Sequence, residues 1–86
     1  MKTQYQHFRF IKIAQRPKTS IWSCQNNRGQ SLGLAKWYSP WRQYCYFANT
    51  DAVYSKGCLA DIGTFLGELA EERKQQRAMD RPQLEG

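Results

Sequence analysis

The stretch Lys36-Trp37-Tyr38-Ser39-Pro40-Trp41-Arg42-Gln43-Tyr44-Cys45-Tyr46-Phe47 contains six aromatic rings and two permanent cations in twelve residues. Aromatic residues favour β-strands on both sides of its centre. Ser39-Pro40 marks a turn, because proline presets φ and has no N–H to donate to a central ladder. The stretch therefore predicts two antiparallel strands joined by a turn, with more rings than a small core needs.

Further strands are predicted before this stretch. Runs of aromatic and β-branched residues, bounded by turn residues, place the four strands at residues 8–14, 21–25, 32–38 and 41–48. The second and third are joined by Asn26-Asn27-Arg28-Gly29-Gln30, whose Asn and Gly residues tolerate positive φ, so they form a hairpin.

A change in the spacing of apolar residues after Ser55 predicts one helix. Apolar residues recur at spacings of three and four, which is typical of an amphipathic helix. They are Leu59, Ile62, Phe65, Leu66 and Leu69. Ser55 is the candidate N-cap, Pro82 is the latest possible stop, and the expected helix covers residues 56–78. The predicted class is α+β, an antiparallel sheet of three to four strands packed against one C-terminal helix (ββββα).

Length and charge limit the organisation of the chain. With 86 residues, we expect a single domain over residues 1–80 and a frayed tail over 81–86. The formal net charge is +6, and residues 1–56 contain nine Lys or Arg against Asp51 alone. Such a field attracts anions, although solubility alone would also account for a moderate excess.

The cysteines and the N-terminus favour an intracellular protein. Cys24, Cys45 and Cys58 form no CxxC pair and leave one thiol over in any disulfide scheme. No segment resembles a signal peptide or approaches the length of a bilayer span. We therefore expect a reduced, cytoplasmic protein.

Alternation along the strands sorts side chains between the two faces of the sheet. The assignment that places no charge in the core buries one set under the helix. That set is Trp22, Cys24, Ala35, Trp37, Cys45 and Phe47. Lys36, Tyr38, Arg42, Tyr44 and Tyr46 are then expected on the opposite face, where the tyrosines either bind a ligand or only stiffen the sheet as cross-strand pairs.

A binding site is predicted from the cations and rings on that opposite face. Aromatic faces stack on planar rings, and Lys and Arg pair with phosphates. The predicted ligand-binding residues are Lys36, Tyr38, Trp41, Arg42 and Tyr44, with Arg28 closing from the hairpin loop.

Self-association is predicted from a row of small residues on the helix. Ala60, Gly63, Gly67 and Ala70 follow spacings of three and four. A mid-helix Gly costs about 1 kcal/mol relative to Ala, so two of them suggest a close neighbour. That neighbour is either the chain's own sheet or the same helix of a second subunit, and we expect a homo-oligomer.

No catalytic, metal or cofactor site is predicted. His7 is the single histidine and lies near a terminus. Cys58 begins the helix without a base nearby in sequence. The segment from Asn27 to Gly33 lacks the GxxxxGK[ST] pattern of a phosphate loop. We therefore expect a non-enzymatic protein without a cofactor.

The central residues resemble a family of short uncharacterised phage and prophage proteins with the patterns LGxIKWYxPWRQYCFF and CLxDIxxFL. The matching residues are Leu32-Gly33, Lys36-Trp37-Tyr38, Pro40 to Cys45, Phe47, Cys58-Leu59, Asp61-Ile62 and Phe65-Leu66, and Ala35 departs from the pattern. The resemblance implies a phage origin and hence the cytoplasm of a bacterial host. In size, charge and aromatic content the chain is also similar to phage anti-defence proteins that act as nucleotide sponges.

Three functions remain open from the sequence. The first is a protein that binds and sequesters a phosphate-bearing nucleotide, such as a host-defence signal. The second is a nucleic-acid-binding protein that uses the basic aromatic sheet face. The third is an inhibitor that binds a host protein directly through its aromatic patch.

Overall fold

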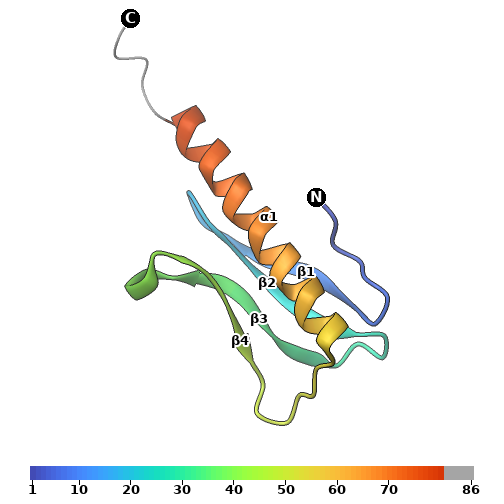
Figure 1. Ribbon diagram of the computed structural model, residues 1–86. Helices are drawn as coiled ribbons and strands as arrows, with labels where there is room; N and C mark the ends of the chain where they lie inside the picture. Colours follow the sequence, from blue (N-terminus) through green and yellow to red (C-terminus); the bar gives the residue numbers. More distant parts are fainter. Residues whose placement is uncertain (81–86) are drawn as a thin grey trace, which may run out of the picture.

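A four-stranded antiparallel sheet is covered on one face by a single helix (Figure 1). The computed structural model describes residues 1–80, with the side chains of residues 1–76. The strands are β1 (Phe8–Gln15), β2 (Ser20–Asn26), β3 (Ser31–Tyr38) and β4 (Gln43–Ala48), in the spatial order β1-β2-β3-β4, and the helix is α1 (Lys56–Asp80). The α+β class and the ββββα order are confirmed. The predicted tail over 81–86 and the stop at Pro82 lie outside the described residues.

Helix α1 begins at the predicted cap and packs by a row of three buried side chains. The Ser55 hydroxyl accepts a hydrogen bond from the Cys58 backbone N–H at 3.1 Å, which satisfies one of the free donors of the first turn. The row is Ile62, Phe65 and Leu69. The predicted burial of Leu59 is wrong, because 56% of its surface is exposed.

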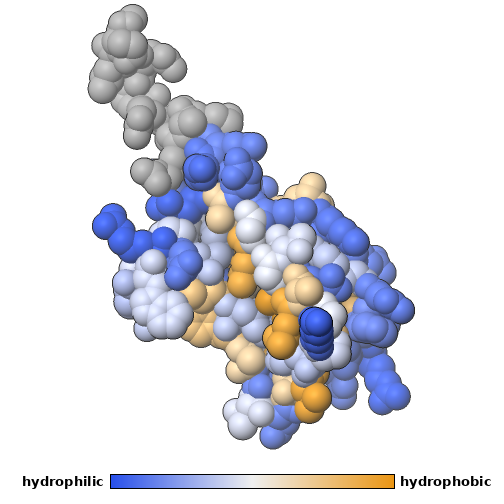
Figure 2. Space-filling view, viewed as in Figure 1, coloured by the Kyte–Doolittle hydropathy of each residue, from blue (hydrophilic) through white to orange (hydrophobic). Residues whose placement is uncertain are grey.

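Aromatic stacking fixes helix α1 on the sheet. The Phe65 ring stacks on Phe10 of β1, with centroids 3.8 Å apart, and meets Trp22 of β2 edge-on at 5.3 Å. Figure 2 shows the surface of the molecule from the helix side. Hydrophobic residues gather there in a central band, with hydrophilic residues around it. The core thus lies between α1 and the near face of the sheet.

The side-chain alternation of β4 differs from the sequence prediction. Tyr44 pairs with Trp37 and Cys45 pairs with Lys36, so Tyr44 and Tyr46 lie under the helix, on the same face as Trp22, Cys24, Ala35 and Trp37. The prediction for those last four residues is confirmed. The prediction that Cys45 and Phe47 face the helix, and that Tyr44 and Tyr46 face away, is wrong.

Hydrogen bonds explain why two tyrosines can lie under the helix. The Tyr44 hydroxyl accepts a bond from the Ser20 backbone N–H at 3.1 Å. The Tyr54 hydroxyl donates to the Leu32 carbonyl at 2.6 Å and lies 2.7 Å from the Tyr46 hydroxyl, which is then the donor between the two. A buried hydroxyl that has a hydrogen-bond partner avoids most of the desolvation cost of an unpaired one.

The N-terminal segment adds to the core. The Phe10 N–H donates to the Thr3 carbonyl at 2.7 Å, and the Tyr5 N–H donates to the Phe8 carbonyl at 2.8 Å. This short pairing places the Tyr5 ring against Phe8 and Phe10, with only 6% of Tyr5 exposed. The sequence analysis did not include Tyr5 in the core.

The row of small residues on α1 faces away from the sheet. Ala60, Gly63, Gly67 and Ala70 are exposed, and a Cβ added at Gly63 or Gly67 would meet no atom within 4 Å. The chain's own sheet is therefore not the close neighbour of this row. The homo-oligomer remains a prediction, which sedimentation at micromolar concentration would test.

Replacing both helix glycines should stabilise the protomer. We expect Gly63→Ala and Gly67→Ala each to raise the free energy of unfolding by about 0.5–1 kcal/mol, because alanine loses less backbone entropy and neither Cβ is obstructed. Urea denaturation at a concentration where sedimentation shows a monomer measures the change. A loss of stability under that condition would contradict the exposed position of the row.

None of the described residues forms a helix with the length and apolar character that crossing a bilayer requires.

Candidate anion-binding site

The connection between β3 and β4 holds Arg42 in an unusual backbone conformation. A single 3₁₀ turn, η1 (Ser39–Trp41), starts with Pro40 near its N-terminus and ends where the Arg42 N–H donates to the Ser39 carbonyl at 3.0 Å. Arg42 has φ 54° and ψ 46°, in the left-handed region. This region costs a residue with a Cβ about 1–2 kcal/mol, and such strain is concentrated at functional sites.

The Arg42 side chain lines a cavity of about 380 Å³ that also contacts Lys18, Trp37 and Arg73. Lys18 comes from the β1–β2 turn, Trp37 from β3 and Arg73 from α1. Figure 1 shows the β1–β2 turn and the β3–β4 connection at the end of the sheet toward which the C-terminal half of α1 runs. Three cations from separate elements thus line one cavity, and two of them, Lys18 and Arg42, are exposed to solvent.

Arg73 is the most constrained of these cations. Its guanidinium carbon lies 4.0 Å from the centroid of the Trp37 ring, a cation–π contact. Its Nε is buried and has no hydrogen-bond partner among the residues that the structure describes. A buried charged donor without a partner costs about 1–3 kcal/mol or more, so Arg73 is left with a bond to make.

A smaller hollow adjoins the cavity and contributes one carboxylate. Lys18 and Arg73 line both spaces, and the smaller one also contacts Glu72 and Tyr44. The carboxylate of Glu72 offsets one of the three positive charges. The site as a whole is therefore positive and suits an anion with more than one negative charge.

The structure divides the predicted ligand-binding residues among three places. Arg42 lines the cavity, and Tyr44 lines the adjoining hollow but is only 6% exposed. Arg28 is exposed in the β2–β3 loop, whereas the cavity lies by the β1–β2 and β3–β4 connections. The predicted closure of one site by Arg28 together with Arg42 is not formed.

Lys36, Tyr38 and Trp41 form a separate cluster that includes Phe47. The Tyr38 ring meets Trp41 edge-on at 5.1 Å and Phe47 at 5.8 Å, and the Lys36 ammonium lies 4.7 Å from the Phe47 centroid. Lys36 and Tyr38 alternate with Trp37 along β3, so they occupy the face of the sheet opposite the helix. Trp41 is 65% exposed.

Sequence reasoning did not include Lys18, Trp37 and Arg73 in the site. Trp37 was assigned to the core, which is correct for its face but hides its contact with Arg73. Arg73 follows the buried Leu69 by four residues, so the helical period already placed it on the sheet side of the helix. Nothing in the sequence around Lys18 beyond its place in a turn pointed to the cavity.

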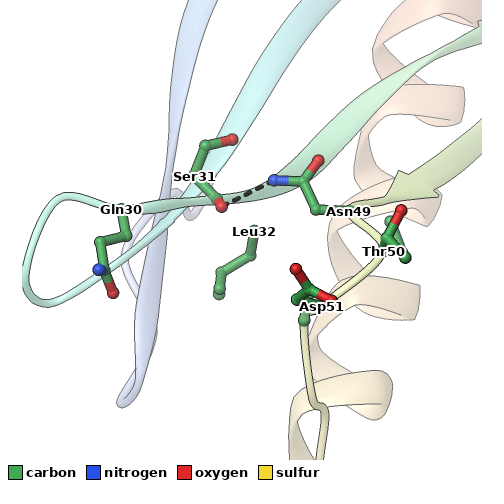
Figure 3. Close-up of a pocket in the computed structure, with 8 residues that line it drawn as sticks. Gln30, Ser31, Leu32, Asn49, Thr50 and Asp51 are labelled. Carbon is green, nitrogen blue, oxygen red and sulfur yellow. Dashed lines mark hydrogen bonds between the residues drawn. The ribbon is translucent and has the colours of Figure 1, made fainter.

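A larger hollow of about 630 Å³ lies at the start of β3 and the end of β4 (Figure 3). The Asn49 side-chain amide donates to the Ser31 carbonyl at 2.8 Å across it, and Leu32 points into it. Its charged lining residue is Asp51, and no Lys or Arg lines it. A negative and amide-rich lining does not suit the anion that the composition of the chain favours.

The buried titratable groups are held in their neutral forms. Burial, and next the hydrogen bond to Tyr54, raise the pKa of Tyr46 far above its ordinary value. Burial also raises the pKa of Cys24, whose side chain is fully buried, and that of Tyr54. These groups stay protonated at neutral pH and act as packing and hydrogen-bonding residues.

Comparison with known proteins identifies a phage relative. The chain is 30% identical over 73 residues to the "Uncharacterized 9.3 kDa protein" of Acholeplasma phage L2, a match that covers 85% of this chain and 94% of the relative. No protein-family model matches, and no solved structure matches. The chain therefore belongs to the phage protein family that includes the 9.3 kDa protein of Acholeplasma phage L2.

Proposed function

We propose that the protein binds and sequesters a phosphate-bearing nucleotide without chemical turnover, with the phosphate in the cavity between Lys18, Arg42 and Arg73. The observation that carries the proposal is the cavity itself, which Lys18, Arg42 and Arg73 line together with Trp37. Arginine and lysine are the side chains that proteins use to hold phosphate oxygens. A phosphate in this cavity would bring acceptor oxygens to all three cationic residues.

Trp41 is the proposed stacking residue for the nucleotide base. Its ring is 65% exposed in the cluster with Tyr38, and Arg42 is the next residue, so a nucleotide with its phosphate beside Arg42 would reach this ring around the end of the sheet. Stacking of a base on an aromatic ring contributes about 1–3 kcal/mol and tolerates every base. In a phage protein, such binding would remove a nucleotide signal of the host's defence from solution.

The test begins with what the purified protein carries. Protein isolated from bacterial cells should release a nucleotide on heating, which mass spectrometry of the supernatant identifies. A thermal-shift panel should then include nucleoside monophosphates, cyclic mononucleotides, cyclic dinucleotides and ADP-ribose. Absence of both a released nucleotide and any shift would overturn the proposal.

Replacement of the exposed tryptophan should weaken nucleotide binding selectively. We expect Trp41→Ala to lower the affinity by about tenfold while the free energy of unfolding changes by less than about 1 kcal/mol, because the ring is mostly in solvent. Calorimetric titration and urea denaturation measure the two quantities. The control is Leu59→Ala, which also removes an exposed apolar side chain, in this case one on helix α1. This variant should leave the affinity unchanged.

A second candidate function rests on the open face of the sheet. Residues 1–50 contain no Asp or Glu, so every charge on the strands is positive. Lys36, Tyr38, Phe47 and Trp41 lie together there, which suits a single-stranded nucleic acid. Binding of this kind should weaken steeply with salt, since several phosphate contacts release counterions, whereas one nucleotide in a cavity responds less.

A further inference from the structure

We infer that the cavity selects a terminal phosphate monoester over a cyclic phosphodiester, an inference that rests on the proposed function and narrows its ligand class. The observations are the number of cations around the cavity, their separate origins and the single carboxylate beside them. Each step concerns the phosphate group alone and leaves the base and sugar unspecified.

Charge matching is the first argument. Lys18, Arg42 and Arg73 surround the cavity, and Glu72 lies in the adjoining hollow with Lys18 and Arg73, so the local excess is two positive charges. A phosphate monoester has a charge of about −1.5 to −2 at pH 7. A phosphodiester carries one negative charge per phosphate. The monoester neutralises the site, and the diester leaves one cation unmatched.

The count of oxygen atoms is the second argument. A monoester presents three terminal oxygens in three directions, and the cavity presents cationic groups from the β1–β2 turn, the β3–β4 connection and helix α1. Arginine is suited to bidentate contact with such oxygens. A cyclic diester has two free oxygens, and its ring would have to face the third cation. That arrangement would leave one of the three cationic groups that line the cavity without an acceptor.

The pH dependence of binding distinguishes the two classes of ligand. The second pKa of a phosphate monoester is about 6, so below that pH the ligand loses one negative charge, whereas a diester keeps its charge. Guanidinium groups stay charged over this range. The groups that line the two spaces are Lys18, Arg42, Arg73, Glu72 and Tyr44 together with neutral residues, and His7 is not among them.

The experiment measures the affinity of the full chain for matched ligands by isothermal titration. The probes are the four ribonucleoside 5′-monophosphates and their 3′,5′-cyclic counterparts, at pH 7.5 and pH 5.0. We expect the best 5′-monophosphate to bind at least about tenfold more tightly than its cyclic counterpart, the factor expected when one charge-assisted hydrogen bond is lost. Its affinity should fall by about tenfold at pH 5.0, and that of the cyclic ligand should stay constant.

The possible outcomes separate this inference from the proposed function. Equal affinity for the two classes, or a 5′-monophosphate affinity that does not change with pH, overturns the inference and leaves nucleotide binding in place. Binding of a cyclic dinucleotide or ADP-ribose without binding of any monophosphate also overturns the inference and leaves nucleotide binding in place. If none of these ligands binds, the proposed function fails and the inference fails with it.

Discussion

Gly33→Ala is expected to lower the free energy of unfolding by about 3 kcal/mol, a large part of the stability of an 86-residue domain. A Cβ at this position would lie 2.6 Å from the Phe47 carbonyl oxygen, 2.6 Å from the Tyr46 hydroxyl and 2.7 Å from the Tyr46 ring carbon Cζ. Carbon atoms in contact prefer separations of about 3.5–4.0 Å. Neither the β4 backbone nor a ring held under the helix can move away cheaply.

The loss at Gly33 has two physical parts. Displacement of the Tyr46 ring breaks its hydrogen bond to Tyr54, which is 2.7 Å long, and leaves a partly buried hydroxyl without a partner. Displacement of β4 weakens its pairing with β3, because Gly33 lies opposite Ala48 in that ladder. Thermal unfolding should show a decrease in Tm of about 15 °C.

Gly57→Ala is the matched control for this prediction. Its added Cβ would lie 3.8 Å from the Ser55 hydroxyl, an ordinary contact distance, in the first turn of α1. We expect unchanged or slightly higher stability for this variant. A Gly33→Ala protein as stable as the Gly57→Ala protein would contradict the close approach of Tyr46 to β3.

The elements of this fold could be predicted from the sequence because their signals are local. The alternating strands, the Ser55 cap and the period of three and four in the helix each depend on residues close together in the chain. Observed strand and helix boundaries lie within two residues of those predicted. The one segment missed, residues 3–5, has no such signal and is ordered by its pairing with the start of β1.

The face assignment of β4 could not be predicted in the same way, because it depends on the geometry of the preceding turn. Arg42 adopts a left-handed conformation that is rare for a residue with a Cβ, and the strand that follows it pairs Tyr44, rather than Gln43 or Cys45, with Trp37. A shift of one residue moves every side chain of a strand to the other face. Hydrogen-bond partners for Tyr44 and Tyr46 came from Ser20 and Tyr54, which are distant in sequence.

Arg42 is the one residue of the cavity that the sequence prediction included among the ligand-binding residues. The prediction placed Arg42 on the face opposite the helix and Trp37 in the core, whereas both line the cavity together with Arg73 of the helix. Lys18 and Arg73 are brought there by the antiparallel sheet and by the length of α1, which are tertiary features. The only sequence signal for these two residues was the four-residue spacing between Leu69 and Arg73, which places Arg73 on the sheet side of the helix.

The double variant Arg42→Gly with Arg73→Gln is expected to lose nucleotide binding without losing stability. Each arginine supplies charge-assisted contacts of about 1.5–3 kcal/mol to a bound phosphate, so the affinity should fall by about 100-fold or more. Stability should remain within about 1 kcal/mol of the original protein. Glycine relieves the positive φ of 54° at position 42, and glutamine removes the Nε that has no partner among the described residues, at the cost of the contact with Trp37.

A matched control removes the same charge elsewhere on the protein. Arg9→Gln with Arg28→Gln lowers the net charge equally at two exposed positions that do not line the cavity, so nucleotide affinity should change by less than about threefold. Isothermal titration and urea denaturation of both double variants provide the comparison. Equal losses of affinity in the two would show that the general positive field captures the anion. Binding residues that are held under strain are expected to be dispensable for folding. If the Arg42→Gly and Arg73→Gln protein unfolds, the two arginines have a structural role instead of a binding role.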